Sequence, residues 1–310
     1  MTVVVTGSAG FIGRALTRHL ARSGHHVVAV DRAHQPDMSG LTTLTADLLD
    51  GDPQVDAALR EADAVVHLAG CSGVRDTTPG IEARRIRDNV DATRAVASRV
   101  PSDVPLMVAS SSSVYGGARF GRASHESDPL HPRGGYAASK AGTEQVCADR
   151  AAAGGHALVV RPFTVVGEGQ RPDMAVARWA AAASAGDPLR VFGSLDRTRD
   201  FTCIREVVRA LAALLHSGAS GVVNLGSGAP RTLRELVHAL GSALAVDLDV
   251  RVEKAAGYEV ADTWADTGRL IALTGMRPHT DLDDVVRRFV AGLPNAAPDH
   301  DPSDSLVGAG

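Results

Sequence analysis

Thr6-Gly7-Ser8-Ala9-Gly10-Phe11-Ile12-Gly13 is the stretch that decides the fold of this chain. It follows a β-branched run, Thr2–Thr6, that predicts a buried strand, and a helical pattern continues from it to about Ser23. A GxxGxxG turn between a strand and a helix lets the backbone approach a pyrophosphate, whose charge the helix N-terminus stabilises. The stretch therefore predicts a dinucleotide-binding turn, although such glycines also occur in purely structural turns.

Strand and helix patterns then alternate through the first half of the chain. Further strands are predicted at His26–Val30, Leu41–Ala46, Ala64–Leu68, Leu106–Ala109 and Ala157–Arg161, and helices at Pro53–Glu61, Ile81–Val100 and Tyr136–Ala153. This alternation predicts an α/β fold, a Rossmann-type doubly wound parallel sheet with helices on both faces. After Pro162 the elements become shorter, at Ala175–Ala185, Val207–His216, Leu233–Leu244, Leu248–Val252 and Leu282–Val290. They predict a smaller C-terminal substrate-binding lobe.

Composition restricts the partners that we expect. The 310 residues are 44% hydrophobic and 22% charged, and a net charge of −4 argues against nucleic acid as a partner. Three scattered cysteines, Cys71, Cys147 and Cys203, predict neither disulfides nor a metal site, but reduced thiols in a cytoplasmic protein. No apolar run approaches the roughly 18 residues of a membrane span, and the N-terminus lacks a signal-peptide pattern.

Two acidic positions refine the expected cofactor. Asp31 ends the second strand, where a carboxylate can accept hydrogen bonds from ribose hydroxyls and repels a 2′-phosphate, which favours NAD over NADP. Arg32 beside it leaves open the binding of a phosphate. Asp47, after the third strand, is equally consistent with contact to the adenine amino group and with a helix cap.

The domain division follows from these motifs. We expect an NAD-binding Rossmann domain over residues 1–161, with returning elements near 200–226. The substrate-binding lobe is expected over residues 162–199 and 227–293. Residues 294–310 are rich in Pro, Asp, Ser and Gly without an apolar period, which predicts a disordered tail.

Tyr136-Ala137-Ala138-Ser139-Lys140 is a YxxxK motif at the start of a predicted helix, with both functional side chains on one face. A neighbouring ammonium and the positive nicotinamide ring favour the phenolate of Tyr136, which makes this residue a candidate general base. The segment Ser110-Ser111-Ser112-Ser113-Val114-Tyr115-Gly116 follows an apolar strand. Its hydroxyls are expected at the carboxyl edge of the sheet, where α/β folds bind ligands. A polar turn is the simpler explanation for the serines alone.

Together these residues resemble the extended short-chain dehydrogenase/reductase family, and within it the NAD-dependent nucleotide-sugar 4-epimerases. The resemblance runs from about Val3 to Val290. It is carried by TGSAGFIG, Asp31, Ala46-Asp47-Leu48, His67-Leu68-Ala69-Gly70, Asn89, SSSSVYG, YAASK, Arg161-Pro162, Arg199-Asp200-Phe201, Asn224-Leu225-Gly226 and Trp264-Ala265-Asp266. Many relatives dimerise through two helices, here around Ile81–Val100 and Tyr136–Ala153, so a homodimer is expected.

The resemblance implies a set of site residues. The catalytic residues would be Ser111, Tyr136 and Lys140. The NAD-binding residues would be Gly7, Gly10, Phe11, Ile12, Gly13, Asp31, Arg32, Asp47, Leu48, Leu68, Ala69, Asn89, Tyr136, Lys140 and Pro162. The nucleotide-sugar substrate would contact Arg75, Ser111, Ser112, Ser113, Thr164, Arg171 and Arg199.

The serine loop and its neighbours indicate a subfamily. The 4,6-dehydratases carry an Asp–Glu pair where this chain has Ser112 and Ser113, and the decarboxylases usually carry Glu at the second position. Arg161-Pro162-Phe163-Thr164-Val165 and Arg171-Pro172-Asp173-Met174-Ala175 look most like UDP-glucuronate 4-epimerases, in which Thr164 and Arg171 would contact the sugar carboxylate.

Three departures leave the substrate open. Cys203-Ile204-Arg205-Glu206 replaces the family's usual sequence after RDF, Val166 replaces a tyrosine, and the segment 255–260 lacks the common PGD pattern. The alternatives are an epimerase or 4-ketoreductase of a deoxysugar nucleotide, and a non-catalytic NAD-sensing protein.

Overall fold

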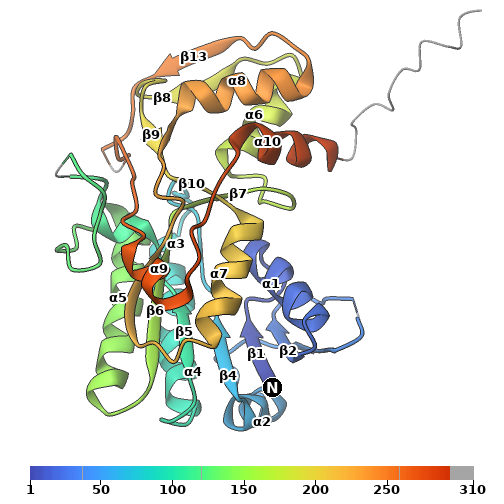
Figure 1. Ribbon diagram of the computed structural model, residues 1–310, viewed down its shortest axis with the longest axis vertical. Helices are drawn as coiled ribbons and strands as arrows, with labels where there is room; N and C mark the ends of the chain where they lie inside the picture. Colours follow the sequence, from blue (N-terminus) through green and yellow to red (C-terminus); the bar gives the residue numbers. More distant parts are fainter. Residues whose placement is uncertain (37, 120, 258, 294–310) are drawn as a thin grey trace, which may run out of the picture.

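The computed structural model describes residues 1–36, 38–119, 121–257 and 259–293 (Figure 1). The predicted disordered tail, residues 294–310, lies outside the described residues. The larger part is a seven-stranded parallel sheet in the order β11-β6-β5-β4-β1-β2-β3. The predicted Rossmann-type sheet is confirmed.

Six strands of this sheet lie close to their predicted positions, and the seventh, β11, lies in the region 200–226, where only returning elements were expected. They are β1 (Thr2–Thr6), β2 (His26–Asp31), β3 (Leu41–Thr45), β4 (Ala64–His67), β5 (Leu106–Ala109), β6 (Ala157–Pro162) and β11 (Gly221–Leu225). In β1, Val3 and Val5 enter the core on one face of the sheet and Val4 enters the core on the other. Both faces are therefore covered, which explains why the central strands read as continuous apolar runs.

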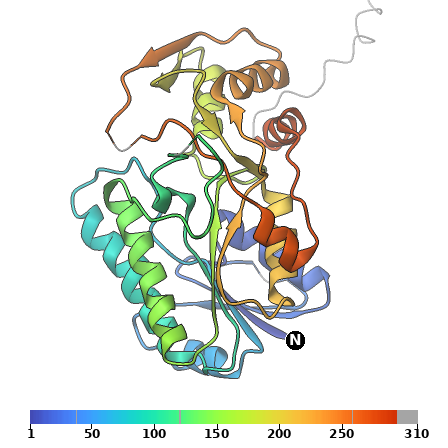
Figure 2. The ribbon, with the colours of Figure 1, turned by 60° about the vertical axis from the view of Figure 1, so that its left-hand side comes forward.

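Helices cover the two faces. One face carries α1 (Phe11–Arg22), α7 (Ile204–Leu215) and α9 (Gly268–Thr274), and the other carries α2 (Pro53–Glu61), α4 (Ala92–Arg99) and α5 (Gly134–Ala152). Figures 1 and 2 show α4 and α5 side by side along the outside of the sheet. The returning elements α7 and β11 complete the Rossmann half.

The helix predicted at Ile81–Val100 is present, but it is not α-helical throughout. It consists of α3 (Ile81–Arg85), a π-helical segment η1 (Ile86–Asp91) and α4. Successive residues of an α-helix point about 100° apart, but the wider π turn buries two neighbours, Asp88 and Asn89, at 5% and 0% exposure. Apolar periodicity cannot reveal this change of pitch, because the polar residues at the turn are the ones that it buries.

A second core holds the smaller lobe together. The lobe contains β7 (Thr164–Val166), α6 (Ala175–Ser184), β8 (Leu189–Phe192), β9 (Thr198–Arg199), β10 (Phe201–Cys203), β12 (Arg231–Thr232), α8 (Leu233–Leu244), β13 (Val250–Glu253) and α10 (Leu282–Ala291). Trp179, Leu236 and Phe289 pack together in its core. Thr232 and Glu235 form a capping box that fixes the start of α8.

One part of the chain departs from the predicted division. Residues 227–293 were assigned to the lobe, but α9 packs against α7 and β11, and its Leu270 is fully buried in the core of the large sheet. The chain therefore crosses back to the Rossmann half before it ends in α10. Within the described ranges, none of the helices combines the length and apolar character needed to cross a bilayer.

Candidate active site

The glycine turn between β1 and α1 is a close-packed backbone cradle. Gly7 has a φ of +70°, and a Cβ there would come within 2.4 Å of the Ala69 nitrogen. A Cβ on Gly13 would come within 2.1 Å of the Gly7 carbonyl oxygen. Only glycine fits at these two positions, so the turn brings the N-terminus of α1, with Phe11 and Ile12 in its first turn, up to the edge of the sheet.

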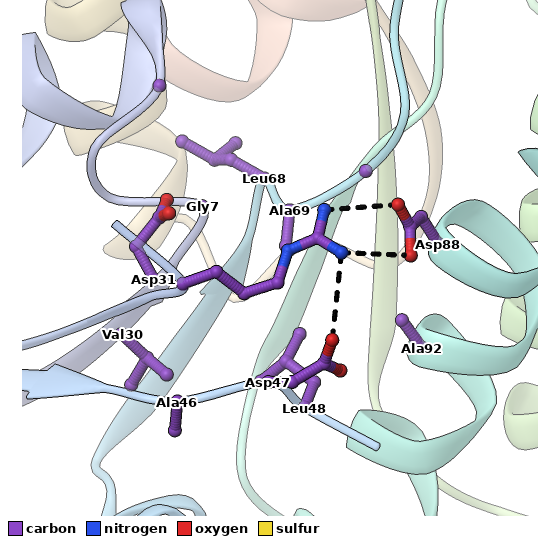
Figure 3. Close-up of a pocket in the computed structure, with 13 residues that line it drawn as sticks. Gly7, Val30, Asp31, Ala46, Asp47, Leu48, Leu68, Ala69, Asp88 and Ala92 are labelled. Atoms are coloured by element: carbon purple, nitrogen blue, oxygen red, sulfur yellow. Dashed lines mark hydrogen bonds and ion pairs between the residues drawn. The ribbon is translucent and has the colours of Figure 1, made fainter. Parts of the chain in front are cut away.

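A pocket opens beside this turn at the carboxyl ends of β1, β2 and β4 (Figure 3). Many of the predicted cofactor residues line it, together with residues that the sequence did not single out. The lining residues are Gly7, Gly10, Val30, Asp31, Arg32, Ala46, Asp47, Leu48, Leu68, Ala69, Gly70, Asp88 and Ala92. This is the position at which parallel α/β sheets bind ligands.

The acidic residues of the pocket have different partners. Asp31 accepts hydrogen bonds from the backbone nitrogens of Ala9 (3.0 Å) and Ala33 (2.9 Å). Asp47 accepts from the Leu49 nitrogen at 3.0 Å. The cap of α2 is Asp52, which accepts from the nitrogens of Gln54 and Val55, so the helix-cap interpretation of Asp47 is wrong.

Asn89 supports the site from behind. Its side-chain oxygen Oδ1 accepts from the Cys71 nitrogen at 2.8 Å, and its side-chain nitrogen Nδ2 donates to the Cys71 carbonyl oxygen and the Ser139 hydroxyl. The side chain is fully buried and joins the loop after β4 to α5. These contacts hold the loop after β4 against α5, and the predicted contact of Asn89 with the cofactor stays a prediction.

The predicted catalytic residues meet where β5 faces α5. Tyr136 and Lys140 lie one turn apart on α5, and the Lys140 Nζ donates to the Ala109 carbonyl oxygen at 2.8 Å. Ser111 precedes η2 (Ser112–Tyr115), and its hydroxyl lies close enough to Tyr136 to lower the pKa of that phenol. Burial lowers the pKa of Lys140 to about 8. The structure therefore places the three predicted catalytic side chains together.

The groups that shift the pKa of Tyr136 are not the ones that the sequence predicted. Burial raises the pKa of Tyr136, while the Ser111 hydrogen bond and the nearby Arg171 guanidinium act in the opposite direction. We expected Lys140 to stabilise the phenolate, but Ser111 and Arg171 are the groups that do so here. The ammonium of Lys140 is directed instead at the backbone of β5.

A buried polar network holds the serine loop against α5. The Ser110 hydroxyl donates to Glu144 at 2.6 Å, and Arg161 forms an ion pair with the same carboxylate at 2.7 Å. Arg161 also donates to the Tyr115 hydroxyl, which donates in turn to Asn224. This network fixes the loop between β5 and η2.

Three other predicted site residues lie nearby in the chain. Ser112 and Ser113, the predicted substrate contacts, lie in η2, and Pro162 follows Arg161 at the end of β6.

Arg171 lies on the lobe side of Tyr136. Its guanidinium forms a two-bond ion pair with Asp173 at 2.8 and 2.9 Å, and it lies near enough to lower the pKa of Tyr136. Thr164, the other predicted carboxylate contact, lies half-buried in β7. An arginine beside the candidate base suits an anionic substrate group.

Two predicted substrate residues brace loops. Arg75, after β4, forms an ion pair with Glu259 of the lobe and lies 4.8 Å from the Phe192 ring centroid. Arg199 donates to the carbonyl oxygens of Thr198, Val260 and Ala261. Arg199 thus ties the segment before Thr263 to β9, and its donors point at the backbone.

Comparison with known proteins identifies the family. The model of the NAD-dependent epimerase/dehydratase family matches residues 3–226. The chain belongs to this family. It is 32% identical to the GDP-6-deoxy-D-mannose reductase of Pseudomonas aeruginosa, over 93% of this chain and 95% of the relative.

Solved structures agree with this assignment. MoeE5 in complex with UDP-glucuronic acid and NAD has a TM-score of 0.85 at 32% identity, covering 94% of this chain and 98% of MoeE5. The UDP-glucuronic acid 4-epimerase from Bacillus cereus, in complex with UDP-glucuronic acid and NAD, has a TM-score of 0.87 at 27% identity with the same coverage. This epimerase/dehydratase is therefore an NAD-dependent enzyme, which sets aside the non-catalytic alternative.

Sequence reasoning missed one charged residue of the epimerase/dehydratase pocket. Asp88 lines it and forms ion pairs with Arg32, Arg84 and Arg87. A charged residue on a predicted helix is normally expected to be solvent-exposed. The one hint in the sequence is that Asp88 directly precedes Asn89. In the part of the chain that the structure describes, no three His, Cys, Asp or Glu side chains gather to hold a metal ion.

Proposed function

We propose that this enzyme is a nucleotide-sugar 4-epimerase of the UDP-glucuronate/UDP-galacturonate type. The observation that carries the proposal is that the Arg171 guanidinium lies near enough to Tyr136 to lower the pKa of its hydroxyl. A guanidinium there supplies a partner for a carboxylate on the sugar carbon next to the reacting one. Ser112 and Ser113 stand where dehydratases need acids, which supports a reaction without loss of water.

The residues at the sheet edge fit NAD. The cradle of Gly7 and Gly13 has no room for a Cβ, which suits close approach of a pyrophosphate, and Asp31 stands at the end of β2 for ribose hydroxyls. The other predicted contacts are Gly10, Phe11, Ile12, Leu48, Leu68 and Ala69 along the same turn and pocket. When bound, NAD would supply a reversible hydride acceptor for the sugar carbon.

The chain's own residues move the proton. Tyr136 as phenolate takes the proton of the sugar 4-hydroxyl, and the Ser111 hydroxyl donates a hydrogen bond that stabilises the charge at the reacting oxygen. Arg171 holds the sugar carboxylate. A 4-keto sugar results, and Tyr136 returns the proton once the sugar has presented its other face. The positive charge of Arg171 stabilises the anionic form of Tyr136.

The experiment that tests this proposal uses the purified protein and UDP-glucuronate without added NAD. Proton NMR follows the sugar ring signals. We expect UDP-galacturonate to appear, because the cofactor is regenerated in each turnover. An unchanged spectrum from folded protein that contains bound NAD contradicts the glucuronate assignment.

A second candidate is a deoxysugar nucleotide 4-epimerase or 4-ketoreductase. The GDP-6-deoxy-D-mannose reductase at 32% identity supports it. The altered segment Cys203-Ile204-Arg205-Glu206 after the RDF motif also departs from the common pattern. As a 4-ketoreductase it would turn over a 4-keto-6-deoxy sugar nucleotide with a reduced nicotinamide. As a 4-epimerase it would interconvert deoxysugar nucleotides without added nicotinamide. In neither case would UDP-glucuronate be turned over.

We further propose a cytoplasmic homodimer. The dimer would form through α3, η1, α4 and α5, which lie along one side of the molecule (Figure 2). Ile86 of η1 is 51% exposed on that side. An apolar side chain that is exposed in the single chain would be buried by contact with a second subunit. The three cysteines are free, buried thiols, which suits a reducing compartment. Light scattering on the purified protein tests the dimer.

A further inference from the structure

Four charged side chains form an alternating arrangement at one side of the cofactor pocket. Arg32 reaches Asp88 at 3.0 Å and Asp47 at 3.6 Å, and Arg87 reaches the same two carboxylates at 2.7 and 2.9 Å. We call Arg32, Asp47, Arg87 and Asp88 the quartet. Figure 3 shows dashed lines that reach Asp47 and Asp88, while the carboxylate of Asp31 points away toward Gly7.

Asp88 is the member that holds the quartet together. Its side chain is only 6% exposed, whereas that of Arg32 is 50% exposed. Asp88 receives two hydrogen bonds from Arg32, at 3.4 and 3.0 Å, and also pairs with Arg84 at 3.5 Å. A buried carboxylate with three guanidinium partners is well satisfied, so the position of Arg32 is set from the Asp88 side.

The position of Arg32 matters because it directly follows Asp31. An arginine at this point of the chain can otherwise turn toward a phosphate on the adenosine ribose, since a guanidinium is a good phosphate partner. Here its donors are directed at two carboxylates across the pocket. Within the quartet each guanidinium is paired with both carboxylates, so the charge of Arg32 is already compensated on the side that faces the pocket.

We propose that Asp88 is a positioning residue that sets cofactor selectivity: it holds Arg32 across the pocket and so keeps adenine dinucleotides with a 2′-phosphate from binding. The inference rests on the proposed assignment of this pocket to the adenosine half of NAD. It goes beyond the repulsion by Asp31, because it makes the rejection of NADP depend on a residue on η1 that follows Asp31 by more than fifty positions in the chain.

The test compares the binding of NAD⁺ and NADP⁺ to protein freed of copurified nucleotide, measured by isothermal titration calorimetry. In Asp88→Asn, Arg32 loses its closer ion-pair partner and keeps only the 3.6 Å pair with Asp47, and the quartet gains a positive charge. We expect the Kd of NADP⁺ relative to that of NAD⁺ to fall about tenfold, as one new charge-assisted contact gives. Asp91→Asn is the matched control, because Asp91 is an exposed carboxylate on the same segment that pairs with Arg94. That control should leave the ratio unchanged.

Further variants separate this proposal from its rivals. Arg32→Ala/Asp88→Asn should return the ratio to the wild-type value, because the released guanidinium is then missing. Arg32→Ala alone, at a half-exposed position, should change NADP⁺ binding by less than about threefold. A tenfold loss of NADP⁺ affinity in Arg32→Ala would show that Arg32 already serves the phosphate, and it would overturn the proposal even if Asp88→Asn failed to fold.

Two other results also overturn it. An unchanged ratio in folded Asp88→Asn would mean that Asp88 does not restrain Arg32. Wild-type protein that binds neither nucleotide would remove the pocket assignment itself. The sugar specificity of the proposed epimerase does not enter this measurement, so its failure and the failure of the selectivity proposal are distinguishable.

Discussion

Arg161 of β6 and Glu144 of α5 form a buried ion pair, with Nη2 and Oε2 2.7 Å apart and both side chains less than one tenth exposed. Glu144 also accepts from Ser110, the first serine of the loop that carries Ser111. The pair therefore connects the central sheet, the catalytic helix and the serine loop. Because both side chains are buried, either charge would be costly if it lost its partner.

Removing one partner of this pair should destabilise the fold. Arg161→Leu leaves the Glu144 carboxylate buried without a cation, and we expect a loss of about 3–5 kcal/mol in the free energy of unfolding. Urea denaturation measures it. Arg234→Ala breaks an ion pair with Asp196 that is exposed on both sides, and it should cost less than about 1 kcal/mol. Equal effects of the two substitutions would contradict the importance of burial.

The hydroxyl of Tyr136 should be required for turnover and not for cofactor binding. Tyr136→Phe keeps the ring but removes the group that exchanges the proton, so kcat should fall by at least about a thousandfold. NAD affinity, measured by calorimetry, should stay within a few-fold of wild type. Retained turnover would remove Tyr136 from the role of base, whatever its position beside Ser111.

Arg171 should act on substrates that carry a carboxylate. In Arg171→Met we expect kcat/KM for UDP-glucuronate to fall about a hundredfold, which corresponds to the loss of a two-bond ion pair. The pair with Asp173 competes for the same guanidinium, so Asp173→Asn should preserve or improve the KM. Kinetics of both variants decide the matter, and a loss of activity in Asp173→Asn equal to that in Arg171→Met would favour a purely structural pair.

His67 should make the protein sensitive to acid. Burial lowers the pKa of His67 to about 3, and the ring hydrogen-bonds to the hydroxyls of Thr6 and Thr93. In the unfolded chain the pKa is near 6.5, so the unfolded state binds the proton first as the pH falls. Stability from this neutral ring is complete above about pH 6.5 and is lost toward pH 3, by at most roughly 1.4 kcal/mol per pH unit.

Replacing His67 tests whether this histidine causes the loss of stability as the pH falls. His67→Gln should show a smaller fall in the free energy of unfolding between pH 7 and pH 5 than the wild type, as measured by urea titrations. His238→Gln changes an exposed histidine on α8 and should retain the full pH dependence. The same slope in all three proteins would exclude His67 as the acid-sensitive group.

Much of the Rossmann half could be predicted from the sequence, because its signals are local. The glycine turn and the valines of β1 define a strand, a turn and a helix within about twenty residues of chain. YxxxK and the serine loop predicted a cluster that the structure assembles around Tyr136. The comparisons confirm NAD as the cofactor, while the contacts of individual residues with it stay predictions.

The missed features depend on distant partners. Strands such as β9 and β12 are two residues long and exist only because they pair with each other across the lobe. The return of α9 to the large sheet rests on Leu270, with Leu273 and Met276 packed beside it, and this short apolar stretch is too brief to predict a helix of the large sheet. Asp88 appears as a surface charge until the fold brings Arg32 to it. Such contacts leave no periodic pattern in the sequence.

The π-helical segment η1 lets two neighbouring residues of one helix contact two different parts of the molecule. Asp88 reaches Arg32 beside the pocket, while Asn89, the next residue, reaches the Cys71 loop and Ser139. An idealised α-helix of the same composition would turn these neighbours about 100° apart and lose one of the two contacts. Deleting a single residue to restore a regular α-helical pitch would therefore cost one of two contacts: the hydrogen bond from Asn89 to Ser139 of α5, or the ion pair between Asp88 and Arg32.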